Sequence, residues 1–191
     1  MGQYYMTFIE IDNKTTVYDR TVDGQYNGAK LMEHSWLLNP FVQSISKLIF
    51  KHPARIVWCG DYANDDEKHN ALKEKTGIDF CMAVWGDEGY TSEGIKKDCL
   101  ELNDKYLINH TSKEFIDCNK YIERCTMKDG WCIHPLPLLT ALGNGQGGGD
   151  YRGINEDIVG AWAYQLISID DVIPENYIEI DIESVTFLEE D

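Results

Sequence analysis

The stretch ALGNGQGGGDYRG, residues 141–153, holds six of the sixteen glycines of the chain. Glycine lets a backbone approach other groups closely, and the amides of such a loop can form an anion-binding nest. The spacing Gly143-x-Gly145-x-x-Gly148 matches the dinucleotide fingerprint, but that fingerprint follows a strand, and the preceding segment here has a helical pattern. The loop also lacks the Gly-Lys-Ser/Thr of a Walker loop. Two interpretations stay open: a loop packed against another segment, and a loop that faces a ligand.

Acidic and histidine side chains near the loop are candidates for binding or proton transfer. Asp61 follows an apolar strand, and His134 precedes the prolines that lead to the loop. A histidine beside a carboxylate can act in acid–base chemistry, although a histidine among Trp and Leu is more often a hydrogen-bonded core residue. The candidate ligand-binding residues are Gly145, Gly147, Gly148, Gly149, Asp150, Tyr151, Asp61, His34 and His134. No nucleophile or zinc-protease motif occurs, so no catalytic residue is assigned.

The six cysteines do not form a metal-binding pattern. No Cys-x-x-Cys pair is present, and the carboxylates of segment 61–67 lack the spacing of a calcium loop. The N-terminal residues carry no secretory signal, so we expect reduced thiols that serve as small buried apolar groups. We therefore predict no metal site and no cofactor. The cysteines are Cys59, Cys81, Cys99, Cys118, Cys125 and Cys132.

The charge of the chain is strongly negative and unevenly distributed. Acidic residues number 33 against 17 basic ones, a net charge of −16, and segment 153–191 contains no Lys or Arg. Such a field repels nucleic acid and anionic membranes and attracts basic protein surfaces. The alternative is that the charge only keeps the protein soluble. The candidate partner-binding residues are Glu175, Glu179, Asp181, Glu183, Glu189 and Glu190.

Residues 177–188 alternate between apolar and acidic side chains. This pattern predicts a strand with Ile178, Ile180 and Ile182 on the buried face and a row of carboxylates on the exposed face. Charges on such a strand protect a sheet edge from aggregation. They could also imitate the phosphates of a nucleic acid.

The remaining hydrophobic pattern predicts an α+β fold with a largely antiparallel sheet. In the first half we expect a hairpin over 4–19 with a turn at 12–14, helices over 28–37 and 39–50, and strands over 54–59 and 80–85. In the second half we expect a hairpin over 106–116, a strand over 131–134, a helix over 138–142, a helix-like stretch over 158–164 and a strand over 166–169. Gly143, in the left-handed conformation, would cap the helix over 138–142. Hairpin, helix and strand thus occur twice, as a weak pseudo-repeat.

The length of 191 residues suits a single domain. Sub-lobes over about 1–63 and 105–191 would be joined by a polar middle segment. No apolar run approaches the ~20 residues that span a bilayer. We expect a cytoplasmic protein.

Several motifs together resemble a family of small uncharacterised proteins from phages, prophages and gut-type bacteria. They are GQYY at 2–5, KLMEHSW at 30–36, GDYA at 60–63, NHTSKEFID at 109–117 and the segment 134–151. The resemblance implies no catalytic residues, and it implies a phage-type setting, in the host cytoplasm if the protein is phage-encoded.

Three function hypotheses follow. The first is a non-enzymatic acidic protein that inhibits a host defence or nucleic-acid-handling protein by occupying its basic surface, as anti-CRISPR proteins do. The second is a protein or enzyme that binds a small nucleotide-like ligand at the glycine-rich loop 143–150. The third is a structural or assembly protein of a phage.

Overall fold

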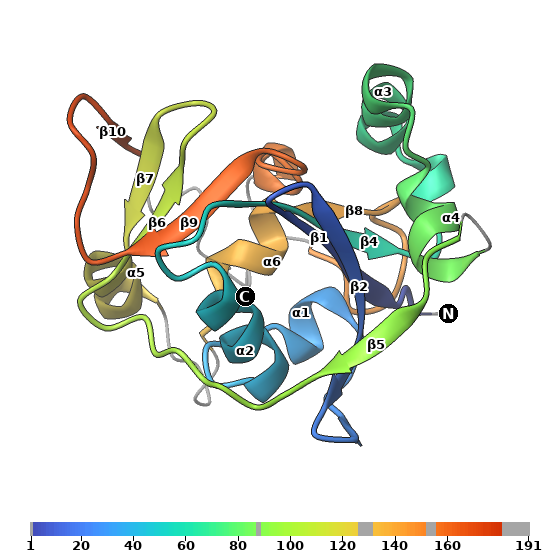
Figure 1. Ribbon diagram of the computed structural model, residues 1–191, viewed down its shortest axis with the longest axis horizontal. Helices are drawn as coiled ribbons and strands as arrows, with labels where there is room; N and C mark the ends of the chain where they lie inside the picture. Colours follow the sequence, from blue (N-terminus) through green and yellow to red (C-terminus); the bar gives the residue numbers. More distant parts are fainter. Residues whose placement is uncertain (1, 87–88, 126–131, 152–155, 181–191) are drawn as a thin grey trace, which may run out of the picture.

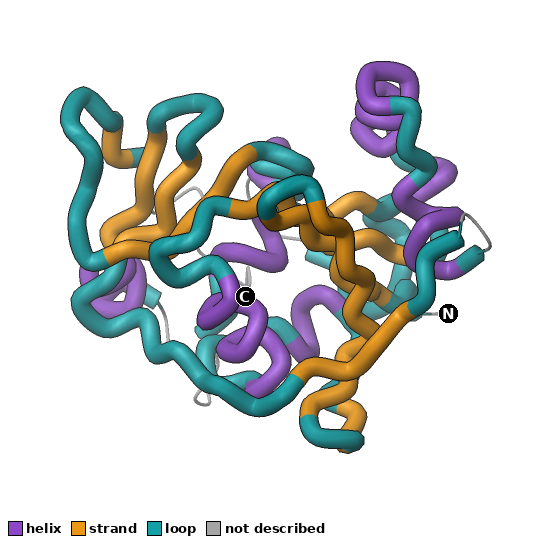
Figure 2. Tube along the Cα trace, viewed as in Figure 1, coloured by secondary structure: helices purple, strands orange, loops and turns teal. Residues whose placement is uncertain are grey.

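The computed structural model describes residues 2–86, 89–125, 132–151 and 156–180 (Figures 1 and 2). The strands are β1 (Tyr5–Ile11), β2 (Lys14–Val22), β3 (Gln25–Tyr26), β4 (Ala54–Gly60), β5 (Ser92–Ile95), β6 (Tyr106–Asn109), β7 (Glu114–Asp117), β8 (Ala141–Leu142), β9 (Leu166–Asp170) and β10 (Ile178–Glu179). The helices are α1 (Leu31–His34), α2 (Pro40–Leu48), α3 (Glu67–Thr76), α4 (Phe80–Trp85), α5 (Cys118–Arg124) and α6 (Pro135–Leu139), with 3-10 turns η1 (Ala63–Asp65) and η2 (Glu156–Ile158). Within the described ranges, no helix is long and apolar enough to cross a membrane.

One sheet runs through both halves of the chain, in the order β10-β7-β6-β9-β4-β1-β2-β3. Its pairs are mostly antiparallel, and β5, β8 and β10 join as parallel neighbours of β2, β4 and β7. The predicted α+β class with a largely antiparallel sheet is therefore confirmed. At the centre β4 pairs with β9, with hairpin β1–β2 beside β4 and hairpin β6–β7 beside β9. This strand order places the two hairpins on opposite sides of the central β4–β9 pair.

Strand β4 is buried on both faces. Ile56 and Trp58 lie in the larger core cluster with α2 and α6, whereas Val57 and Cys59 lie in a second cluster under α4. This double burial explains the continuous apolar run of β4, which does not alternate as a half-exposed strand does. Figure 1 shows α1, α2 and α6 inside the curve of the sheet and α3 and α4 at its other end from β7 and β10.

Both predicted hairpins and the predicted strands over 54–59 and 166–169 are confirmed. The first hairpin turns through Asp12 and Asn13, which both have positive φ, and its second strand extends to Val22. A two-residue turn of this kind matches the twist of the paired strands. The second hairpin, β6–β7, and strands β4 and β9 also lie where they were predicted.

The predicted strand over 80–85 is wrong, because these residues form helix α4. The side chain of Asp79 caps the helix by accepting a hydrogen bond from Met82 N at 3.0 Å. A six-residue apolar run has no decisive periodicity. The N-terminal cap therefore decides the structure of this segment.

The predicted helices differ from those observed in their bounds. The helix over 28–37 is reduced to α1, since Gly28 has a φ of +77° and Trp36 forms a bridge with Ile133. The helix over 39–50 ends at Leu48. In place of a helix over 138–142, α6 starts at Pro135 and ends at Leu139, and the chain continues as β8. Gly143 therefore caps no helix. The helix-like stretch over 158–164 consists of turns after η2.

The predicted strand over 131–134 is only the bridge at Ile133, and Trp131 lies outside the described residues. The predicted tail strand is described only up to residue 180. Its β10 pairs in parallel with β7, and Ile180 packs against the larger core. Ile178 is 71% exposed, contrary to its predicted place on the buried face. The remaining residues of the predicted strand, 181–188, lie outside the described residues.

Candidate functional site

The glycine loop packs over the N-terminal segment of the same chain. Gly2 and Gly148 form a parallel bridge, and the side chain of Gln3 lies beneath the loop with 0% exposure. The close backbone approach that the glycines indicated is therefore an approach to another part of the protein.

Three glycines from separate positions surround Gln3. An added Cβ would lie 2.6 Å from the side-chain amide of Gln3 at Gly60, 2.6 Å from the same amide at Gly143 and 2.5 Å from Gln3 Cβ at Gly147. Contacts this short are not tolerated in packed interiors. We use the name Gln3 cradle for the residues around this side chain, namely Gly60, Gly143, Gly147, Tyr5 and Asp150.

Hydrogen bonds satisfy the buried polar groups of the Gln3 cradle. With its amide oriented to suit its neighbours, Gln3 donates to Tyr5 Oη and to Asp150 Oδ2, both at 2.9 Å, and accepts from Tyr62 N at 3.1 Å. Tyr5 Oη donates to Asp150 Oδ1 at 2.8 Å, and Gly147 N donates to Asp150 Oδ2 at 2.9 Å. Burial and the Asp150 carboxylate raise the pKa of Tyr5, so its hydroxyl keeps its proton. Asp150, 6% exposed, thus has three neutral donors.

The other loop residues differ in their surroundings. Gly149 has a φ of +87°, and an added Cβ there would lie 2.8 Å from Lys30 Cδ. Gly145 is exposed with a φ of +67°, and Gly148 is exposed with no atom closer than 4.0 Å to an added Cβ. Tyr151 is buried in the larger core. Gly145 and Gly148 therefore form the outward side of the loop.

Acidic side chains in segment 61–67, which follows β4, accept hydrogen bonds from the backbone of the glycine loop and of the N-terminal segment. Asp66 Oδ2 accepts a hydrogen bond from Gly143 N at 2.9 Å. Asp61 Oδ1 accepts one from Tyr4 N at 3.1 Å. The candidate residue Asp61 thus lies beside the Gln3 cradle, where it binds backbone.

His134 is a buried cap of α6. Its Nδ1 accepts from Leu136 N at 3.1 Å, which leaves Nε2 protonated and donating to Ser46 Oγ at 3.0 Å. Both ring nitrogens are therefore used, and His134 forms no acid–base pair with Asp61 or Asp150. Burial lowers the pKa of His134 to about 3.

His34 lies at the end of α1, near the loop but oriented by the backbone. Its Nδ1 accepts from Lys30 N at 3.2 Å, and its ring covers Gly28, where an added Cβ would lie 1.9 Å from the ring. Partial burial, followed by the charge of Arg20, lowers the pKa of His34.

Gln3 and Arg20 are among the buried polar residues that the sequence interpretation missed. Arg20 is fully buried, stacks on Phe41 and Trp58, and donates from Nε to Gly28 O at 2.7 Å. Burial lowers the pKa of Arg20 to about 9, so it stays cationic at neutral pH. Gln3 belongs to the GQYY motif, and no local pattern marks either side chain as buried.

The acidic C-terminal segment is partly neutralised by the protein itself. Both oxygens of Glu179 lie 2.8 Å from Lys120 Nζ, which contradicts a free carboxylate row at this position. Asp171 bridges Lys51 and Lys105 at 2.7 and 3.0 Å. Glu175 is exposed. The candidates Asp181, Glu183, Glu189 and Glu190 lie outside the described residues.

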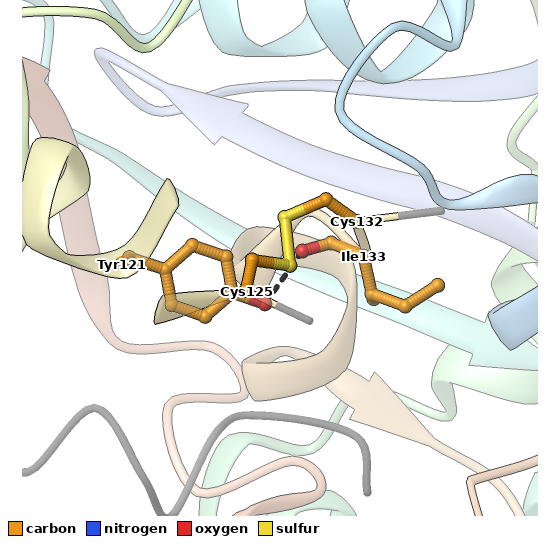
Figure 3. Close-up of a disulfide and its surroundings, with 4 residues drawn as sticks. All are labelled: Tyr121, Cys125, Cys132 and Ile133. Carbon is orange, nitrogen blue, oxygen red and sulfur yellow. Dashed lines mark hydrogen bonds between the residues drawn. A yellow bond between two sulfur atoms is a disulfide. The ribbon is translucent and has the colours of Figure 1, made fainter. Parts of the chain in front are cut away.

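Cys125 and Cys132 form a disulfide, which contradicts the expectation that all six thiols are reduced (Figure 3). Their Cα atoms are 5.7 Å apart, within the usual range for a disulfide. Cys59, Cys81, Cys99 and Cys118 are free. In the described ranges, no group of three His, Cys, Asp or Glu side chains is placed to hold a metal ion.

The Gln3 cradle predicts a coupling between Gly60 and Gln3. Gly60→Ala should lower the free energy of unfolding by about 1–3 kcal/mol, because the three atoms nearest to the new Cβ all belong to the side chain of Gln3. Gln3→Ala should cost about 1–3 kcal/mol through lost hydrogen bonds, and the double variant should cost at least about 1 kcal/mol less than the sum. Urea denaturation measures all four proteins. Gly60→Ala combined with the exposed Gln25→Ala should be additive, and additivity in the Gln3 pair would contradict the packing.

The burial of His134 predicts acid sensitivity. The folded pKa of about 3 lies below the unfolded value of 6.5, so this residue costs no stability above pH 6.5 and about 1.4 kcal/mol per pH unit as the pH falls toward 3. His134→Asn keeps a capping oxygen and removes this proton linkage. The stability difference between wild type and variant should shrink by about 2 kcal/mol from pH 7 to pH 5. The exposed His52→Asn is the control, and parallel pH curves for wild type and His134→Asn would refute the linkage.

Comparison with models of protein families, with curated proteins and with solved structures finds no match to this chain. The resemblance to small phage and bacterial proteins therefore stays a prediction, and the functional argument rests on the geometry and charge of the molecule.

Proposed function

We propose that the protein is a non-catalytic binding protein that occupies the basic surface of a nucleic-acid-handling protein, such as a host defence enzyme, and thereby inhibits it. The observation that carries this proposal is the net charge of −16. Proteins that handle nucleic acid present basic faces to the phosphates. An acidic protein competes with nucleic acid for such a face.

The exposed surface supports this proposal. Over the described ranges, exposed carboxylates outnumber exposed lysines and arginines. Some of the basic residues pair with these carboxylates. The ion pairs of Glu179 and Asp171 neutralise part of the segment after β9. We therefore propose a contact surface outside these ion pairs. The exposed Glu175 and the acidic residues in the sequence beyond residue 180 are the first to test.

The buried polar residues also favour binding over catalysis. His134 caps α6 through Nδ1 and donates to Ser46 of α2 through Nε2. Arg20 donates to the carbonyl oxygens of Gly28 and of His34, the last residue of α1. Asp150 accepts hydrogen bonds from Tyr5, Gly147 and Gln3. These side chains stabilise the fold, so the proposal needs no catalytic role for them.

The proposal predicts an association that weakens with salt. Partners captured at low salt are purified and their affinity for the full chain is measured by calorimetry. Raising the salt from about 0.05 M to about 0.5 M should weaken binding about tenfold or more, because the attraction of exposed charges is screened. Nucleic acid should compete for the same partner. Binding that is equally tight at both salt concentrations, or to an acidic protein, would refute the proposal.

Matched variants locate the contact. Neutralising Asp181, Glu183, Glu189 and Glu190 together should weaken binding, whereas neutralising four exposed acids elsewhere, Glu74, Glu93, Glu101 and Asp104, should change it less. Equal losses would assign the effect to net charge alone, which contradicts a contact at the C-terminal segment.

A second candidate function is the binding of a nucleotide-like ligand on the outward side of the glycine loop. The observation that favours it is Gly148, which is exposed, does not need positive φ and has free space at its Cβ position. Internal packing therefore does not account for a glycine here. Backbone amides of such a loop would suit an anionic group. The nearby Lys30 is paired with Glu33 at 2.7 Å, so the site would rely on the amides.

A thermal-shift screen tests this second candidate. A nucleotide present at 100 times its dissociation constant should stabilise the protein by about 2.7 kcal/mol, and Gly148→Val should abolish that shift without lowering the melting temperature of the free protein. No shift across a broad panel of nucleotides, with and without divalent cations, would refute it.

A further inference from the structure

The disulfide joins α5 to a segment that also contacts the connection between α1 and α2. Cys125 ends α5, and Cys132 begins the short segment 132–134 that leads into α6. Figure 3 shows Tyr121 of α5 beside the disulfide, where its hydroxyl donates to Ile133 O at 2.6 Å. Segment 132–134 is thus held to α5 by one covalent bond and one hydrogen bond.

The other side of segment 132–134 pairs with residues 35–37. Leu37 N donates to Cys132 O at 2.8 Å, and His134 N donates to Ser35 O at 2.7 Å. The neighbouring Leu38 is 74% exposed, and Trp36 is also exposed. The position of this exposed apolar turn therefore depends on a segment that the disulfide fastens.

The remaining cysteines argue against a purely structural disulfide. Four thiols are free, and Cys99 is exposed. Burial raises the pKa of Cys118 to about 12, which keeps that thiol unreactive. A free exposed thiol such as Cys99 is expected in a reducing compartment, where thiols are not oxidised. Disulfides that form in such a compartment are typically reversible.

We propose that Cys125 and Cys132 form a reversible redox switch that controls the order of residues 35–38. In the oxidised protein the disulfide fixes segment 132–134 and, through it, the exposed turn at Trp36 and Leu38. In the reduced protein the hydrogen bonds and the burial of Tyr121 and Cys132 in the larger core remain. The covalent link is lost, and the turn becomes more dynamic.

The switch uses thiol–disulfide exchange with a small thiol of the glutathione class. Cys125 is the more exposed of the two residues, since it is half-buried and Cys132 is only 4% exposed. The thiolate of the small molecule bonds to Cys125 Sγ, the Cys125–Cys132 bond breaks, and Cys132 leaves as a thiolate that takes up a proton. A second small thiol then displaces Cys125 and yields the small-molecule disulfide. Two thiols are oxidised and one protein disulfide is reduced, and the reverse sequence restores it.

The redox state of each cysteine can be titrated directly. The full chain is equilibrated in buffers of reduced and oxidised glutathione, alkylated and analysed by peptide mass spectrometry. We expect Cys125 and Cys132 to change together from disulfide to dithiol within the range of glutathione ratios found in cytosol. A pair that stays oxidised across this range is a structural disulfide, and a pair that stays reduced in oxidised glutathione forms no disulfide. Either result overturns the proposal.

Hydrogen exchange then measures the structural consequence. On reduction, the amides of Leu37 and His134 should exchange at least fivefold faster, while those of β1 and β4 stay unchanged. Cys125→Ser should give the fast rates under both redox conditions, and Cys99→Ser should respond like the wild type. Equal exchange of Leu37 and His134 in the oxidised and reduced proteins would also overturn the proposal.

Discussion

The burial of β4 on both faces is the constraint on which the other features depend. Its two faces belong to different core clusters, and its edges pair with β1 and with β9. A strand in this position has to be apolar throughout and cannot shift its register without moving both cores. It also fixes where the chain leaves the sheet, because β4 ends at Gly60, directly against Gln3. The N-terminal segment and the glycine loop take their positions from that point.

The glycine loop illustrates how a ligand-like motif arises from internal packing. Gln3 presents a primary amide to Asp150, Tyr5 and the backbone of Tyr62, much as a bound small molecule would. Glycines are needed around it for the same steric reason that they are needed around a phosphate, namely close approach of backbone to another group. A buried carboxylate with three neutral donors is costly to disrupt, since the loss of any one donor leaves an unsatisfied group.

The sequence was most informative where the structure is local. The hairpins follow from alternation and from turn residues that tolerate positive φ, as at Asp12 and Asn13. The segment 80–85 was misassigned because its short apolar run fits a strand or a helix, and the capping carboxylate of Asp79 decided the outcome. Within the candidate site, Asp150 and Gly147 were identified as residues of interest, but Gln3 was not. Its burial depends on glycines 57, 140 and 144 positions away in the chain, and no local pattern encodes such a contact. The disulfide was missed for a related reason, because spacing alone does not bring two thiols together.

The central pairing of β4 with β9 has a consequence for how the protein is made. The two strands are more than one hundred residues apart in the chain, and their register involves only two residue pairs, Ala54↔Ile167 and Arg55↔Leu166. During synthesis the first hairpin unit therefore emerges with one edge of β4 open, and that edge is covered only after β8 and then β9 have been made. Pairing between two strands that lie so far apart in the sequence is slow. Until β8 and β9 have been synthesised, this apolar strand of the nascent chain exposes an unpaired edge that could pair wrongly.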